Sequence, residues 1–216
     1  MVKSLWRGIF VIALSLFVSG CGAKPSIVEL EKNKPVVQNP INSSKKIMIG
    51  NVVDNRKFQI KPASLSTPSL INAQQHTSKS ITSRAVGMKL SYSGDLLLPK
   101  GQTVELTTRR IVEDAFKRRG YNVVHVKSAN VTQVDISIEK FWFWAEKAFW
   151  AFPLQFQSDL ILSSNGRVLT KNPIHVKSDI KMHTQTGGVV GKYVGTIDKA
   201  LLKLEKNIQK VIVPVK

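Results

Sequence analysis

The stretch that decides the fold runs from Val131 to Trp144 and reads VTQVDISIEKFWFW. From Val134 to Glu139 it alternates between apolar and polar residues, which is the pattern of a strand with one apolar and one polar face. Two further strand-like stretches follow before His183. Residues 131–183 therefore predict three strands joined by hairpins, which form an antiparallel meander.

Matching the apolar residues across neighbouring strands gives an expected register for each hairpin. We pair Ile138 with Phe156 in the first hairpin and Phe156 with Ile174 in the second, which leaves residues 164–166 as a three-residue loop. On this register the outer face of the third strand is mostly basic. Its members are Lys171, His175, Lys177, Asp179, Lys181 and His183.

Three aromatic residues do not fit the alternation. On the expected register Phe141, Phe143 and Phe149 fall on the otherwise polar face, near the tip of the first hairpin. Two interpretations stay open. Either the N-terminal segment or residues 55–93 cover them, or they form an exposed apolar patch, which usually marks a contact with a partner or a membrane.

Two helices are expected to cover the apolar face of the sheet. Thr103–Arg119 carries an apolar stripe and ends at Gly120, and Lys192–Val211 carries a second stripe with spacings of three and four. Both stripes need an apolar partner, so we predict a two-layer α+β fold: a mostly antiparallel sheet with two helices packed on one face. Residues 46–213 form a single domain on this prediction, with a core strand at 46–54 and a long irregular excursion at 55–93.

The N-terminus has the three parts of an export signal, with a positive end, an apolar core and small residues before a cut. The small residues end at Gly20, and the single cysteine of the chain follows as Cys21. This arrangement resembles the processing site of bacterial lipoproteins, which implies cleavage between Gly20 and Cys21 and a palmitate-bearing lipid anchor on Cys21. The alternatives are a free cysteine or a simple cleaved signal.

On this interpretation residues 1–20 are the signal peptide and residues 21–45 a flexible tether. Within the tether, residues 27–30 have the character of a short docking strand. Gly22 and Ala23 follow the cysteine, where an Asp would resemble the retention signal of inner-membrane lipoproteins. We therefore expect an outer-membrane lipoprotein on the periplasmic face.

The chain is strongly basic. It has a formal net charge of +18, and removal of residues 1–20 takes away two positive charges and leaves +16. Such a balance predicts an anionic neighbour, and the export signal argues against nucleic acid. A lipid headgroup, lipopolysaccharide or a cell-wall polymer would fit, with Lys171, Lys177 and Lys181 as candidate contacts; a basic surface that is simply solvated is the alternative.

The motifs of common enzymes are missing from the sequence. The four histidines lack metal-ligand spacing, and no phosphate loop, nucleophile elbow or H-E-x-x-H motif occurs. Glu113 and Asp114 are adjacent on the expected helix, so their side chains diverge by about 100°. We therefore expect a non-enzymatic protein with no metal and no cofactor.

A family resemblance rests on the lipoprotein site, the helix that ends in Arg119-Gly120-Tyr121, the strand Val134–Ile138 with its hairpins, and the closing helix. Together these features resemble the YajG-like family of bacterial lipoproteins, and the layout is similar to auxiliary lipoproteins of ABC-type transport systems. The resemblance implies an adaptor or accessory subunit of an envelope transport or assembly system, with a membrane and an envelope protein as partners. The residues themselves leave open the alternative, a binder of an anionic envelope component.

Overall fold

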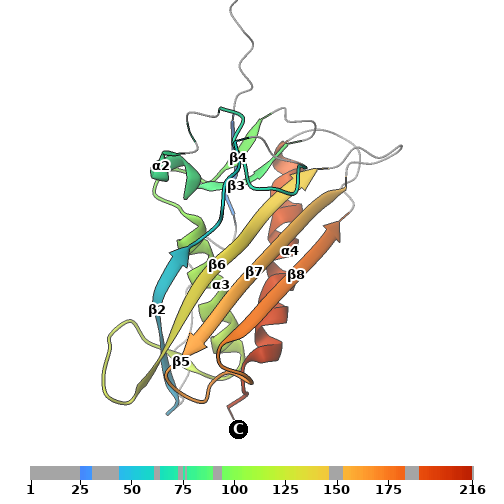
Figure 1. Ribbon diagram of the computed structural model, residues 1–216. Helices are drawn as coiled ribbons and strands as arrows, with labels where there is room; N and C mark the ends of the chain where they lie inside the picture. The colour runs from blue at the N-terminus through green and yellow to red at the C-terminus, as the bar shows by residue number, and fades with distance from the viewer. Residues whose placement is uncertain are drawn as a thin grey trace, which may run out of the picture.

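The computed structural model describes residues 25–30, 44–60, 64–72, 75, 77–89, 94–145, 153–182 and 190–215, with 190–194 as helix backbone only. Their strands form one eight-stranded sheet (Figure 1). The strands are β1 (Ser26–Ile27), β2 (Lys46–Asp54), β3 (Ala85–Met88), β4 (Asp95–Leu97), β5 (Asn122–Val123), β6 (Val131–Ala145), β7 (Leu154–Ser164) and β8 (Ile174–Met182). The helices are α2 (Lys79–Thr82), α3 (Val104–Arg118) and α4 (Val190–Val211).

The two longest ladders of the sheet are antiparallel and join β6 to β7 and β7 to β8. On the other side of β6, β2 and β3 both pair with it in parallel. Figure 1 shows α3 and α4 side by side behind this sheet. The two-layer α+β fold predicted from the sequence is thereby confirmed.

The apolar stripes of both helices face the sheet. Thr103 caps α3 by accepting a hydrogen bond from the Leu106 amide (3.1 Å), and Ile111 and Phe116 are fully buried. On α4, Leu201 and Leu204 are fully buried. Gly120 has a φ of +90°, which glycine adopts without strain, and it ends α3 as predicted.

A β-bulge at Glu139 changes which side chains of β6 face the helices. Ile138 pairs with Leu160, but the next paired residue is Lys140, opposite Asp159. One extra residue in a strand reverses the alternation beyond it. Phe141 and Phe143 therefore continue the apolar face begun by Ile138, and both are fully buried. Their predicted place on the polar face was wrong.

Both predicted hairpin registers were also wrong. Ile138 pairs with Leu160 rather than Phe156, and Phe156 pairs with Ile180 rather than Ile174. The second connection runs from Ser164 to Ile174, and within it Asn172 binds both the amide and the carbonyl of Ser164 (2.9 and 2.6 Å). The shifts are even numbers of residues, so the faces of β7 and β8 agree with the prediction.

The excursion after β2 carries regular elements, α2 and β3, and covers the opposite face of the sheet near the end of β6. Trp142 and Trp144, which the bulge turns away from the helices, are buried there in a second apolar cluster. Its other buried members are Leu70, Ala85, Met88 and Leu97. The backbones come close, since a Cβ on Gly87 would lie 2.3 Å from the Phe143 carbonyl oxygen.

Arg56 holds this covering segment to the sheet. Its side chain is completely buried, and it pairs with both carboxylate oxygens of Asp54 (2.8 and 2.7 Å). The same guanidinium donates to the carbonyls of Thr82, Ala85 and Phe141 (2.8, 2.5 and 3.2 Å). One cation thus joins β2, α2, β3 and β6.

Candidate functional site

The aromatic patch expected at the hairpin tip is not a contact surface in the part that the structure describes. Phe143 stacks on Phe156 with ring centroids 4.1 Å apart, and Phe141 meets the same ring edge-on at 5.1 Å. Both side chains belong to the main core. Phe149 lies outside the described residues, and so do Gly20 and Cys21.

The three lysines expected to contact an anion lie apart from one another. Lys171 is exposed in the connection between β7 and β8. Lys177 is on the outer face of β8, where its amine lies 3.3 Å from a carboxylate oxygen of Asp159. Lys181 is also on β8, and it lines a groove.

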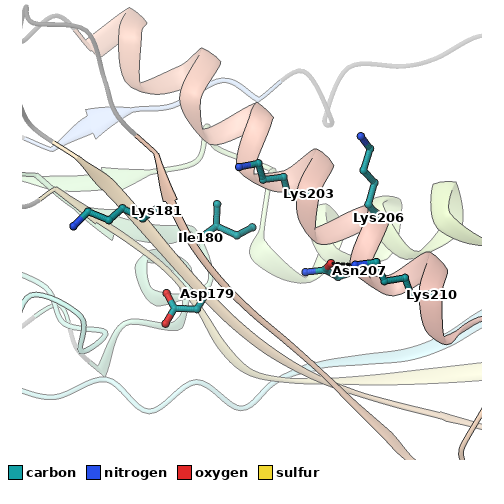
Figure 2. Close-up of a pocket in the computed structure, with 7 residues that line it drawn as sticks. All are labelled: Asp179, Ile180, Lys181, Lys203, Lys206, Asn207 and Lys210. Atoms are coloured by element: carbon teal, nitrogen blue, oxygen red, sulfur yellow. Dashed lines mark hydrogen bonds between the residues drawn. The ribbon is translucent and has the colours of Figure 1, made fainter.

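This groove lies between β8 and α4 and has a volume of about 410 Å³. We call it the basic groove. Figure 2 shows side chains that line it. They are Asp179, Ile180, Lys181, Lys203, Lys206, Asn207 and Lys210.

Helical spacing places three of these lysines on one side of α4. Lys203, Lys206 and Lys210 follow steps of three and four residues and are exposed, while Leu204 and Ile208 face the core. Figure 2 shows the amines spread around the groove rather than directed at one point. Such an arrangement suits an extended or multiply charged anion better than a small one.

Polar contacts hold α4 in place along the groove. The Asn207 amide donates to the Ser178 hydroxyl on β8 (2.9 Å). On the other side of the helix, buried Glu205 accepts a hydrogen bond from Arg118 of α3 (2.5 Å). The Arg118 guanidinium thus pairs with Glu205 outside the groove, and Glu205 is not among the residues that line the groove.

The electrostatic balance of the basic groove is positive, because its lining has four lysines and one acid, Asp179. The Asp179 carboxylate accepts a hydrogen bond from Gln157 (3.1 Å) on the outer face of the sheet. An anion at the groove would meet several amines in contact with water. Its attraction would be real but sensitive to salt.

The α4 lysines were not among the predicted site residues. From the sequence alone, Lys203, Lys206 and Lys210 could be placed only away from the apolar stripe of the expected helix. The missing information was which strand lies next to these lysines, and this depends on how α4 packs on the sheet.

The described residues offer no group of three or more acidic, histidine or cysteine side chains placed to hold a metal ion. Within the same part of the chain, no helix has both the length and the apolar character needed to cross a membrane.

The fold and the groove define a small two-layer α+β domain with a basic edge. No protein-family model matches the chain, and no curated protein matches it significantly in sequence.

Among solved structures, the chain is similar to an uncharacterized protein (TM-score 0.44, 10% identity, covering 87% of this chain and 96% of that one). Another is protein XCC0632 from Xanthomonas campestris, of the family DUF330 (TM-score 0.41, 8% identity, 86% and 90% covered). A third is described as a neuraminyllactose-binding hemagglutinin homolog from Helicobacter pylori (TM-score 0.35, 13% identity, 85% and 91% covered).

Proposed function

We propose that this protein is a lipid-anchored, non-enzymatic envelope protein that binds an anionic envelope component in the basic groove. The observation that carries the proposal is a groove lined by Lys181 and three lysines of α4, with a single acid. The ligand class is a polyanion such as a lipid headgroup array, lipopolysaccharide or a cell-wall polymer. The +16 charge of the chain after residue 20 supports the same class.

The groove lysines can be tested against a matched set. The triple variant Lys203→Gln, Lys206→Gln, Lys210→Gln should bind phosphatidylglycerol vesicles or lipopolysaccharide micelles roughly tenfold more weakly than the parent, since several exposed charge contacts are lost. The measurement is co-sedimentation of the unlipidated chain from residue 22 onward.

The control variant Lys57→Gln, Lys79→Gln, Lys127→Gln removes the same charge from exposed lysines outside the groove. It should bind nearly as the parent does. Equal loss in the two triple variants would mean that net charge alone drives binding and would contradict a groove site.

The anchor is tested separately. Cys21→Ser in the full chain should abolish acylation. Once the signal is cleaved and salt screens the groove, the protein should therefore move from the membrane fraction to the soluble periplasmic fraction, because its lipid anchor is lost. Metabolic labelling with a fatty acid and cell fractionation measure both effects. A variant that has lost its signal peptide and still sediments with outer membranes after a wash in about 1 M salt, which screens the contacts of the basic groove, would remove the anchor from the proposal.

A second candidate is the adaptor or accessory role in envelope transport or assembly that the YajG-like resemblance implies. The observation that favours it is β8, a nine-residue strand that pairs only with β7 among the described residues. An edge strand offers backbone donors and acceptors to an added strand of another protein, although exposed lysines on such a strand oppose uncontrolled pairing. Crosslinking in intact envelopes, followed by capture of the protein, distinguishes a protein partner from an anionic lipid or polymer.

A further inference from the structure

The segment expected to be a flexible tether contains a docked strand. Ser26 and Ile27 pair in parallel with Leu96 and Leu97 of β4, and the Val28 amide donates to the Leu97 carbonyl (2.8 Å). Val28 and Leu30 are buried, with exposed fractions of 0% and 1%. These two side chains join the main core, so residues 26–30 are an integral part of the domain.

Docking of β1 leaves a short connection to the cysteine. Cys21 and Ser26 are five residues apart in the sequence. A fully extended chain covers at most about 3.6 Å per residue, so the sulfur-bearing residue lies within about 18 Å of the start of β1. A free tether through residue 45 would have a mean reach of about 25–30 Å and a much longer maximum.

The strand directions show from which end of the domain this connection leaves. β3 is parallel to β6, β4 is antiparallel to β3, and β1 is parallel to β4. β1 therefore runs opposite to β6, and its first residue lies toward the end of the sheet where β6 finishes at Ala145. The opposite end contains β5 and the start of β6 at the base of Figure 1.

We infer that the docked strand β1 holds the β6-terminal end of the domain against the bilayer surface and directs the β5 end away from it. This inference rests on the lipid anchor of the proposed function. The fifteen residues of β6 cover about 46 Å, so the two ends differ greatly in distance from the membrane. The β6-terminal end of the domain contacts the same bilayer in which the acyl chains of Cys21 are inserted.

Two label positions report the two ends. Ile71 is 38% exposed, and its backbone amide donates to the Asp95 carboxylate (3.2 Å). Asp95 pairs with Met88 of β3, and Met88 pairs with Trp144, so Ile71 lies near the end of β6. Val126 is 77% exposed and follows β5, which pairs with the start of β2. Because Cys21 is the single cysteine and is acylated in the proposed protein, Ile71→Cys or Val126→Cys supplies one free thiol for a fluorophore.

The experiment uses the full lipidated protein in phosphatidylethanolamine–phosphatidylglycerol vesicles that carry a headgroup-linked acceptor dye. Energy transfer from position 71 should exceed that from position 126 several-fold. A ten-residue Gly/Ser insertion between Lys24 and Pro25 should shrink this difference, since it lets the domain move and turn. The same insertion between Asn33 and Lys34 should leave the difference unchanged, because it lies beyond the docked strand.

The outcomes separate the inference from the anchor on which it rests. Vesicle sedimentation is read on the same samples, and a protein that stays in the supernatant overturns the anchor and the orientation together. A protein that sediments but transfers equally from both positions overturns the orientation alone. Equal effects of the two insertions would show that β1 does not set the distance, which also overturns it.

Discussion

Replacement of both Phe141 and Phe143 by alanine should remove a large part of the folding stability of the protein. Truncating a buried phenylalanine costs about 3–5 kcal/mol, and natural domains of this kind have a total stability of about 5–15 kcal/mol. The two rings touch each other and share Phe156, so the two losses will not add fully. Urea denaturation followed by far-UV circular dichroism measures the change in the free energy of unfolding.

A matched truncation on the surface is the control for this pair. Leu202→Ala on α4 truncates an apolar side chain that is 44% exposed, and the unfolding midpoint of this variant should hardly move. Phe143→Leu keeps the fold while losing the ring stack, so it supplies a measurable midpoint if the double variant does not fold. A double variant that melts with the parent would mean that these rings are on the surface after all.

Arg56→Met should cost about 3–5 kcal/mol of folding stability, because removing one partner of a buried pair leaves the other without compensation. The Asp54 carboxylate would lose its cation, and the carbonyls of Thr82, Ala85 and Phe141 would lose a donor. The loss of local stability should be greatest where the Arg56 guanidinium joins the excursion to β6. Hydrogen exchange should therefore rise at Ala85–Met88 before it rises at β7.

Lys57→Met provides the comparison for Arg56, since the neighbouring side chain is exposed. It should leave both stability and exchange near the parent values. Uniform loss of protection across the whole sheet in Arg56→Met, with β3 no more affected than β7, would contradict a local role in holding the excursion.

The alternation in Val134–Glu139 was sufficient to predict a strand and its apolar face, but it could not predict the register. A strand with a period of two residues matches its neighbour almost equally well after any even shift, and the observed pairings differ from those expected by four and six residues. The observed connection between β7 and β8 makes contacts with residues that are distant in sequence. One of them is the bridge between Leu169 and Ile212 beyond α4.

The bulge at Glu139 has no sequence signal that we recognise. Its effect nevertheless accounts for the aromatic run that did not fit, because Phe141 and Phe143 point to the helices while Trp142 and Trp144 point to the excursion. Four consecutive aromatic residues are what a strand buried on both faces requires. The excursion does cover part of the face opposite the helices, but the side chains it covers are Trp142 and Trp144, not the phenylalanines for which that cover was considered.

The candidate site was predicted in part. The exposed face of β8 was expected, and Lys181 lines the basic groove. The partner helix could not be assigned, since Lys203 and Lys210 become neighbours of β8 only through tertiary packing. The short strand at residues 27–30 was suggested by its apolar residues, and its docking on β4 is the finding that changes the expected length of the tether.

The most direct test of the central claim is the salt dependence of binding to phosphatidylglycerol vesicles for three proteins: the parent, the groove triple variant and the control triple variant. Exposed charge contacts are screened as the Debye length falls from about 10 Å at 0.1 M salt to about 3 Å at 1 M. We predict steep, nearly equal salt slopes for the parent and the control, and a distinctly shallower slope for Lys203→Gln, Lys206→Gln, Lys210→Gln. Three proteins with the same slope, or a groove variant that binds as tightly as the parent at low salt, would contradict the assignment of the basic groove as the binding site.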